Sequence, residues 1–572
     1  MRSLELIKSF VTLVGLVSSS PTQVHPHGPP TARARNGTYS GVYSDPYKQE
    51  FFLGIPYAEP PVGDLRFRNP RPVKDSWSEL RPADQYAPAC VGYGPSQMGY
   101  NVSEDCLYLN VIRPAGTKPG EKLPVAVWIH GGAYVQGSGV DLRYNMSFIV
   151  QQSQEMKQPI ISITINYRLS AWGFLQGYET EIGGSNDAGS NWGLRDQRLA
   201  LHWIQENIGA FGGDPNKVTI WGQSAGAASV GMHLLAYNGR DDSLYRAAIM
   251  ESGNPILVGA MNRTYGPLFN NLTTITGCSN ATDSLQCLRD LPFSELNAAV
   301  NTTQLSGVWT PQIDGDIIAR HSSDQVAEGA FVGVPIIVGA NSDEGTSFAP
   351  KGLNTTEQFL RTLTSGTSMN ETFAQRILSA YPLQSHENNL ANLGPVDFVP
   401  PAYPYGTQYR RTATYYTDQT FVANRRLTCQ TWASKSLTAY CFRFNAIPAW
   451  AGAYDGATHF VEVAFAMKNL DGVGYPPVRV PPFQGLPDSY KSLAGLMAGD
   501  WVSFINKLNP NAWRRGNALA DLQPIVPIWD PYNKATGLFV YEGNTTNRME
   551  DDTWRKEGID LINSVNKAVY DR

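Results

Sequence analysis

Short apolar runs recur along the chain, and segments with a helical pattern lie between some of them. The runs have the length and aliphatic composition of β-strands, and they lie at Leu123 to Ile129, Pro159 to Ile165, Val218 to Trp221, Ala247 to Met250 and Val334 to Val338. The clearest helical segment is residues 193–208, where apolar side chains recur at helical spacing. Strands that are apolar throughout, rather than alternately, are buried on both faces. The pattern therefore predicts an α/β fold with a large, mostly parallel sheet flanked by helices.

Loops that follow such strands are where chemistry is expected, because ligands bind beyond the carboxyl ends of parallel strands. The strand Val218 to Trp221 leads into Gly222-Gln223-Ser224-Ala225-Gly226, and the helical segment Ala225 to Leu235 follows. The pattern G-x-S-x-G alone is weak evidence in a chain with 53 glycines. Its position between a strand and a helix is the context that a nucleophilic serine requires. The alternative is a small-residue turn without chemistry.

A serine nucleophile needs a histidine base, and serine hydrolases built on such sheets have the chain order Ser, acid, His. Of the eight histidines, only His386 and His459 lie far enough beyond Ser224 to leave room for the acid. His386 lies in the polar stretch QSHENN, whereas His459 follows the strand Tyr440 to Phe444 and a short connection. Because a loop after a strand is the expected place, we predict that His459 is the base.

The acid and the oxyanion donors are also expected after strands. Asp343 and Glu344 both follow the strand at Val334 to Val338, and the residues alone do not rank the two carboxylates. The backbone N–H of Ala225 is one expected oxyanion donor, and a glycine-rich loop after an earlier strand supplies the others. The segment His130 to Tyr134 has that position and composition.

The N-terminus has the pattern of a secretory signal peptide, which we assign to residues 1–19 with cleavage near Ser19. Arg2 and Lys8 flank the apolar stretch Phe10 to Val17, and small residues follow. That stretch is shorter than the ~20 residues of a membrane span. Ten N-x-S/T sequons agree with secretion, at Asn36, Asn101, Asn145, Asn262, Asn271, Asn280, Asn301, Asn354, Asn370 and Asn544.

Six cysteines form three close pairs in the sequence, Cys90 with Cys106, Cys278 with Cys287, and Cys429 with Cys441. In an oxidising compartment this spacing predicts local disulfides, and buried free thiols are the alternative. None of the cysteines has metal-ligand spacing with histidine, so no zinc site is expected.

The net charge of −5 and the lack of a Lys/Arg run predict no nucleic-acid partner. The C-terminus carries no hydrophobic tail, so we expect no stable membrane anchor. The oligomeric state is left open.

At this point the motifs resemble those of the type-B carboxylesterase/lipase family of α/β-hydrolases, which includes cholinesterases, animal carboxylesterases and large fungal lipases. The likeness covers nearly the whole mature chain, through residues 52–70, 104–110 (EDCLYLN), 128–134 (WIHGGAY), 193–230, 314–318, 341–345 (NSDEG) and 459–465 (HFVEVAF). The resemblance implies an α/β-hydrolase fold, with a large, mostly parallel mixed central sheet flanked by helices, in one catalytic domain over residues 20–572. It also implies a small-molecule ester substrate and neither a metal nor an organic cofactor.

The family's pattern assigns the acid to Glu344 and the base to His459. It assigns the oxyanion hole to the N–H groups of Gly132, Ala133 and Ala225. The family's disulfides match two of the pairs, Cys90–Cys106 and Cys278–Cys287.

Three departures narrow the expected substrate. Ala133 stands where relatives usually have a glycine, and its methyl group narrows the acyl site or restricts the loop. Gln223 stands where cholinesterases carry Glu, which removes a negative charge that a choline cation would use and favours uncharged esters. The loop between Cys90 and Cys106, residues 91–105, is short and contains no Trp. In cholinesterases this loop is longer and carries a cation-binding Trp, and in the fungal lipases it forms a lid.

We therefore predict a secreted serine carboxylesterase that works through an acyl-enzyme. A lipase for long-chain esters is one alternative, and acyl transfer or lactone opening in specialised metabolism is another. A non-catalytic adhesion protein, of the kind that the family also contains, is disfavoured because all three triad positions are intact.

Overall fold

The computed structural model describes residues 28–572 apart from 178–188, 257–262, 366, 384–391, 393–400, 402, 478, 515–525, 533–536 and 545. The segment predicted to be a signal peptide, the sequon at Asn262 and the rejected base candidate His386 lie outside the described residues.

A central sheet of eleven strands organises the molecule, in the spatial order β16-β15-β14-β13-β12-β11-β9-β10-β8-β4-β3. Its strands are β3 (Val42–Ser44), β4 (Gln49–Pro56), β8 (Tyr108–Pro114), β9 (Leu123–Ile129), β10 (Ile161–Ile165), β11 (Gly213–Gln223), β12 (Ala247–Glu251), β13 (Ile336–Asn341), β14 (Ala439–Asn445), β15 (Gly537–Glu542) and β16 (Arg548–Asp551). All neighbours from β10 to β15 are parallel. The predicted α/β fold with a mostly parallel sheet is confirmed.

Antiparallel strands lie at both edges, so the sheet is mixed as the family resemblance implied, although the apolar runs did not locate these strands. The strands β3, β4 and β8 extend one edge, and β16 closes the other. These strands lack the uninterrupted aliphatic runs of the parallel strands. β3 and β16, the outermost two, have no fully buried residue, so their hydrophobic pattern is weak.

Side chains of the parallel strands alternate between two cores. In β9, for example, Val125, Val127 and Ile129 belong to one core, whereas Ala126 and Trp128 belong to the other. Both sets are 0 % exposed. This is why the strands are apolar at every position: successive side chains point to opposite faces, and helices cover both.

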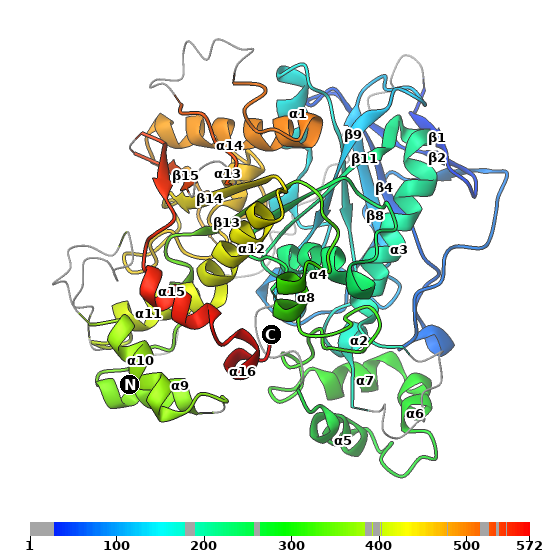
Figure 1. Ribbon diagram of the computed structural model, residues 1–572. Coiled ribbons are helices and arrows are strands. Elements are labelled where there is room, and N and C mark those ends of the chain that lie inside the picture. Colours follow the sequence, from blue (N-terminus) through cyan, green and yellow to red (C-terminus); the bar gives the residue numbers. More distant parts are fainter. Residues whose placement is uncertain are drawn as a thin grey trace, which may run out of the picture.

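One face of the sheet is covered by α1 (Ser147–Glu155), α13 (Val463–Ala466) and α14 (Asp488–Lys507), and the other by α3 (Trp192–Asn207), α4 (Ala225–Gly239) and α12 (Ala423–Ser434) (Figure 1). The short helices α2 (Ser170–Phe174) and α8 (Ser322–Glu328) pack on α3 and α4. The helix expected at residues 193–208 is therefore α3, displaced by one residue.

The remaining helices form two outlying groups in the lower half of Figure 1. One group is α5 (Gly266–Ile275), α6 (Ser284–Asp290) and α7 (Phe293–Val300). The other is α9 (Thr356–Thr364), α10 (Glu371–Ala380), α11 (Tyr409–Thr417), α15 (Lys556–Asn563) and α16 (Asn566–Tyr570). Two small sheets complete the fold, one of β1 (Thr31–Arg33), β2 (Thr38–Ser40) and β5 (Leu80–Pro82), and one of β6 (Ala89–Cys90) and β7 (Val102–Ser103).

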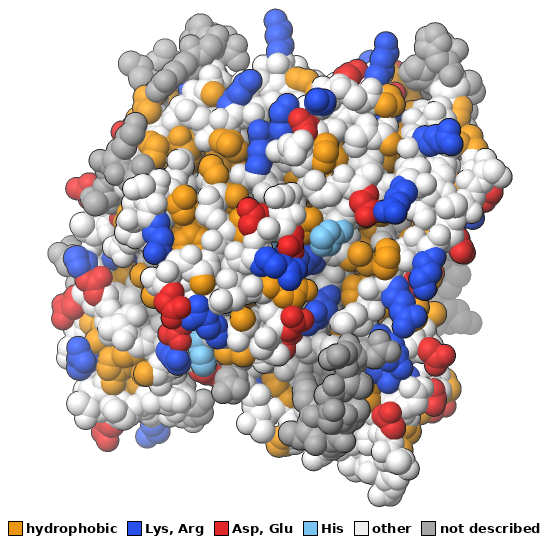
Figure 2. All heavy atoms as spheres, turned by 45° about the vertical axis from the view of Figure 1, so that its right-hand side comes forward, with side chains coloured by type: hydrophobic (Ala, Val, Ile, Leu, Met, Phe, Trp, Pro, Cys, Tyr) orange, Lys and Arg blue, Asp and Glu red, His pale blue; other side chains and the backbone are white. Residues whose placement is uncertain are grey.

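Within the described part of the chain, no helix combines the length and the apolar character that crossing a membrane demands. The face shown in Figure 2 carries Lys and Arg side chains interspersed with Asp and Glu, and its hydrophobic side chains are scattered.

Candidate active site

The predicted nucleophile occupies a sharp turn between β11 and α4. Ser224 has φ 56° and ψ −126°, a conformation that non-glycine residues rarely adopt. Its N–H donates to the carbonyl of Glu251 at 2.9 Å. A Cβ added to Gly222 would lie 2.5 Å from the carbonyl carbon of Gly226, and one added to Gly226 would lie 2.0 Å from the carbonyl oxygen of Ile129. Both glycines are therefore needed for strand and helix to approach this closely.

Three predicted residues meet at the carboxyl ends of three strands. Ser224 follows β11, Glu344 follows β13, and His459 lies in the connection after β14. The Nε2 of His459 is 2.8 Å from the Oγ of Ser224. The Nδ1 of His459 is 2.6 Å from Oε2 of Glu344. With the Nδ1 proton directed at the carboxylate, Nε2 is free to accept the serine proton.

The neighbouring carboxylate, Asp343, lies in a different environment. Its Oδ2 accepts hydrogen bonds from the side chain of Asn392 at 2.7 Å and from the N–H of Ala457 at 2.8 Å. Asp343 thus fixes the loop that precedes His459, and Glu344 is the carboxylate bonded to the imidazole.

The imidazole of His459 is enclosed by aromatic rings. Phe348 contacts it edge-on, with ring centroids 4.9 Å apart, and Phe421 stacks on it at 5.0 Å. Burial disfavours the charged imidazolium, but the charge of Glu344 and its hydrogen bond outweigh this and raise the pKa of His459 above its ordinary value. A raised pKa strengthens the histidine as a base for the serine proton.

A second layer of polar residues holds Glu344 from behind. The Oε1 of Glu344 accepts from the N–H of Asn341 at 2.8 Å and from the hydroxyl of Ser252 at 2.5 Å. That hydroxyl is also 3.2 Å from Oε1 of Glu462, whose other oxygen accepts from the Asn341 amide at 2.5 Å. Burial and the nearby Glu344 raise the pKa of Glu462 to about 7. Glu462 can therefore be protonated and donate to Ser252.

Sequence reasoning missed Ser252 and Glu462. Ser252 directly follows the strand β12, and Glu462 lies three residues after His459. The position of Ser252 at a strand end was a usable signal, whereas Glu462 directly precedes the short helix α13. Nothing in the pattern distinguishes either residue from other polar loop residues.

The expected oxyanion donors lie beside the serine. The N–H groups of Gly132, Ala133 and Ala225 have no hydrogen-bond acceptor within the described residues. Gly132 has φ 107°, and a Cβ there would lie 2.2 Å from the carbonyl oxygen of Gln136, so only glycine fits. Ala133 has φ 57°, in the left-handed region. Unpaired N–H groups beside a serine are what an incoming oxyanion requires.

Gln223 turns its side chain toward the histidine. Its Nε2 is 3.5 Å from Nε2 of His459, and the residue is buried. The uncharged amide of Gln223 thus faces the imidazole, whereas a Glu at this position would place a carboxylate there.

A cavity of about 490 Å³ opens over the serine. Its wall includes Ser224, His459, Gly132, Ala133 and Gln223. The other lining residues include residues 95–96 and 98–100 of the Cys90–Cys106 loop, residues 141–144, Phe348, Phe460, residues 474–477 and Arg479. Most of the other lining side chains are apolar, which suits the carbon skeleton of a small ester.

Known proteins resemble this chain over most of its length. The profile of the Carboxylesterase family matches residues 29–558. The chain belongs to the carboxylesterase family. It is 32 % identical to Lipase 2 of Geotrichum candidum over 579 residues, which cover 92 % of this chain and 93 % of that protein. It is also 32 % identical to Secreted lipase 1 of Botryotinia fuckeliana over 503 residues, covering 81 % and 82 %.

Among solved structures, the crystal structure of Aspergillus niger EstA superposes with a TM-score of 0.79 at 26 % identity, covering 96 % of this chain and all of that one. The protein is thus a carboxylic ester hydrolase of the serine type with the α/β-hydrolase fold.

Three disulfides cross-link the carboxylesterase. Their sulfur atoms lie 2.07 Å apart in Cys90–Cys106, 2.03 Å apart in Cys278–Cys287 and 2.06 Å apart in Cys429–Cys441. The first closes the loop that forms part of the cavity wall.

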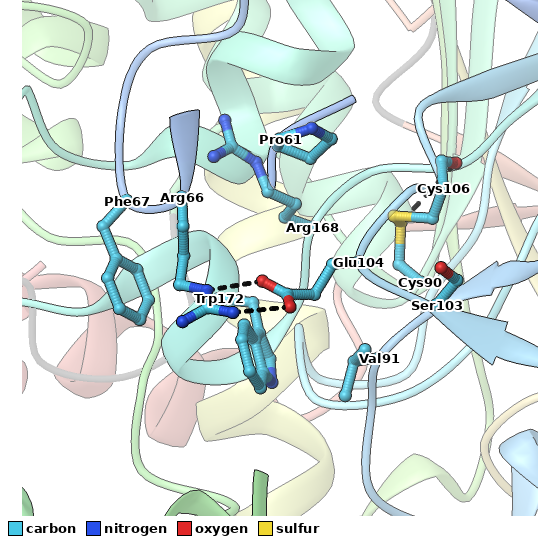
Figure 3. A pocket seen from close by; sticks show the side chains of 10 residues that line it. All are labelled: Pro61, Arg66, Phe67, Cys90, Val91, Ser103, Glu104, Cys106, Arg168 and Trp172. Carbon is cyan, nitrogen blue, oxygen red and sulfur yellow. Dashed lines mark hydrogen bonds and ion pairs between the residues drawn. A yellow bond between two sulfur atoms is a disulfide. The ribbon is translucent and has the colours of Figure 1, made fainter. Parts of the chain in front are cut away.

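Beside the Cys90–Cys106 disulfide lies the small pocket drawn in Figure 3. The guanidinium of Arg66 pairs there with Glu104 at 2.6 Å and also donates to the carbonyls of Leu288, Arg289 and Leu291. This pocket has a volume of about 10 Å³, which holds about one water molecule. It is a structural junction between the loop and the α6 region, and it is too small for a substrate.

The sequon asparagines other than Asn262 can be located. Asn101, Asn280, Asn301, Asn354, Asn370 and Asn544 are exposed, and Asn36, Asn145 and Asn271 are partly exposed. Asn370 also caps α10 by accepting from the N–H of Phe373 at 2.9 Å.

Proposed function

We propose that the esterase uses Ser224 as nucleophile, His459 as general base and Glu344 as the acid that orients His459. The observation that carries the proposal is the continuous hydrogen-bonded chain from Ser224 through His459 to Glu344, with distances of 2.8 and 2.6 Å. The acid behind the histidine selects the tautomer and stabilises the imidazolium.

The reaction then proceeds in two halves. Ser224 attacks the ester carbonyl while His459 takes its proton, and the N–H groups of Gly132, Ala133 and Ala225 receive the developing oxyanion. His459 returns the proton to the departing alcohol, which leaves an acyl-enzyme. Water then attacks the acyl carbonyl, giving its proton to His459, and the carboxylic acid leaves as Ser224 is reprotonated.

We further propose that the substrates are small esters that need no lipid interface. The short Cys90–Cys106 loop supports this, because residues 91–105 leave little chain for a mobile lid. Hydrolysis of long-chain esters is the second candidate, since several relatives are named lipases. A panel of p-nitrophenyl esters graded by acyl length, with and without detergent, separates the two. A rate that peaks at long acyl chains and rises on emulsified substrate would favour the lipase.

Secretion is also proposed. It is supported by three disulfides, which form in oxidising compartments, by the density of sequons and by the secreted relative from Botryotinia fuckeliana. Expression in a fungal host followed by N-terminal sequencing of the protein in the medium tests it. We expect a mature N-terminus close to Ser20. Retention of the protein inside the cell would contradict the proposal.

The catalytic assignment is tested with purified protein and Ser224→Ala. Wild type should cleave short p-nitrophenyl esters, and the variant should lose at least about 10⁴-fold in turnover. An organophosphate should label Ser224 in the wild type. A suitable control is His386→Ala, which we expect to retain activity. Failure to hydrolyse any small ester, together with no labelling of Ser224, would refute the proposal.

A further inference from the structure

The wall of the catalytic cavity carries more positive than negative charge. Its charged side chains, His459 aside, are Asp141, Arg143 and Arg479. Arg143 is committed to Asp141, since its Nε is 3.1 and 3.0 Å from the two carboxylate oxygens and its Nη2 is 2.5 Å from one of them. Its Nη2 also donates to Ser96 at 3.0 Å. This pair neutralises itself, which leaves Arg479.

Among the described residues, Arg479 has no acidic side chain within ion-pair distance. Its guanidinium stacks over the ring of Trp450, 4.0 Å from the centroid. Within the described part of the chain it makes neither a side-chain hydrogen bond nor an ion pair. Asp455 acts on its charge only through space. Partial desolvation by the cavity wall and the charge of Arg143 lower the pKa of Arg479.

The position of Arg479 is fixed by the backbone that carries it. Its N–H donates to the carbonyl of Tyr475 at 2.9 Å, and the N–H of Tyr475 donates to Gly472 at 3.1 Å. A Cβ on Gly474 would lie 2.6 Å from the backbone N of Arg143, so this loop packs directly on the turn at residues 142–144. The loop therefore places the exposed side chain of Arg479 in the cavity wall, where a ligand can reach it.

The loop that carries Arg479 also carries a buried polar group. The hydroxyl of Tyr475 is buried and has no partner among the described residues. Other parts of the cavity wall are apolar: Met98, Leu142 and Phe348 line the cavity and are 61 %, 43 % and 44 % exposed. A ligand that fits both features has a carbon skeleton and an anionic end.

We propose that Arg479 selects esters that carry a second, free carboxylate at a distance from the scissile bond. A guanidinium presents paired N–H donors that match a carboxylate, and stacking on Trp450 leaves its edge available for that contact. The apolar residues contact the chain between the two groups. This inference rests on the proposed function and adds the charge of the substrate. Gln223 led us to expect uncharged esters; the proposal replaces that expectation with anionic esters.

Two matched substrate pairs test the proposal, one for each side of the ester. On the acyl side, mono-p-nitrophenyl adipate is compared with p-nitrophenyl hexanoate. On the alcohol side, p-acetoxybenzoate is compared with p-acetoxybenzamide. The quantity measured is the ratio of kcat/KM for the anionic ester to that for the neutral ester. In the wild type we expect this ratio to exceed one in at least one pair. We also expect the ratio to fall as salt is added, because salt screens an accessible charge.

The decisive variant is Arg479→Gln. We expect the ratio for the favoured pair to fall at least about tenfold, chiefly through a higher KM for the anionic ester, because hydrogen bonds to charged groups have that magnitude. Arg479→Lys should retain part of the preference. The matched control is Arg376→Gln on α10, an exposed arginine that also stacks on an aromatic ring, Phe373, and does not line the cavity. It removes the same charge and should leave the ratio unchanged.

Active-site titration with a neutral organophosphate gives the concentration of folded enzyme in every preparation. If both enzymes hydrolyse the esters and the ratio is the same in wild type and Arg479→Gln, the inference is wrong but the proposed function stands. An equal fall in Arg376→Gln also overturns it, since the effect would then come from net charge. No turnover of any ester and no labelling of Ser224 would overturn the proposed function, and the inference with it.

Discussion

Replacing Glu344 by Gln tests the central hydrogen bond of the site with little change of shape. Glu344 is 0 % exposed, and its Oε2 is 2.6 Å from Nδ1 of His459. Its Oε1 is held by the N–H of Asn341 and the hydroxyl of Ser252, and the amide oxygen of a glutamine can keep both contacts. The new NH₂ group then faces Nδ1, which must become an acceptor.

This change forces the imidazole into the wrong tautomer. The ring proton moves to Nε2, where it faces Ser224 and removes the base. The corresponding substitution in the Ser-His-Asp template lowers kcat by about 10⁴-fold, and we expect a similar loss here, equivalent to about 5 kcal/mol. The two largest influences that raise the pKa of His459 come from Glu344. Since the base acts only when neutral, the acid limb of residual kcat/KM should move to lower pH in the variant.

The assay is the pH profile of p-nitrophenyl butyrate hydrolysis, normalised by active-site titration. Asp343→Asn is the matched control, because it removes an adjacent, equally buried carboxylate that contacts Asn392 and Ala457 instead of the histidine. We expect this control to keep most of the activity. The reasoning is refuted if Glu344→Gln retains more than about a tenth of the wild-type kcat, or if Asp343→Asn loses as much.

Three further substitutions probe the surroundings of the triad. The pKa of Glu462 is raised from 4.5 to about 7, so its contribution to stability is complete below pH 4.5 and is lost as the pH rises through about 7. This loss corresponds to about 3 kcal/mol of unfolding free energy. Glu462→Gln should therefore flatten the fall in melting temperature over that pH interval. Ala133→Gly relieves a left-handed alanine (about 1 kcal/mol) but adds backbone freedom of similar size, so the melting temperature should change little while bulky acyl esters gain rate relative to acetates. Gln223→Glu places a carboxylate about 3.5 Å from Nε2 of His459, and the acid limb of kcat/KM should move to higher pH, with choline esters improved relative to neutral ones. An unmoved acid limb would contradict this account of Gln223.

The layered fold and the location of the site follow from the pattern of residues along the chain. Strands that are apolar at every position require a cover on both faces, and this predicts parallel strands with helices between them. Parallel strands bring their carboxyl ends to one edge of the sheet. Ser224, Glu344 and His459, which lie far apart in the chain, could therefore be expected to meet there.

Which side chains point at one another is seen only in the folded chain. Asp343 and Glu344 are adjacent, and residue patterns alone left both open; only the path of the loop after β13 directs one toward His459 and the other toward Asn392. For the same reason, the residue pattern did not single out Ser252, Glu462 or Arg479 as members of the site. Periodicity specifies which face of an element is buried, because that depends on local spacing. The direction of a polar side chain in a loop depends on packing against residues hundreds of positions away, and that packing exists only in the folded chain.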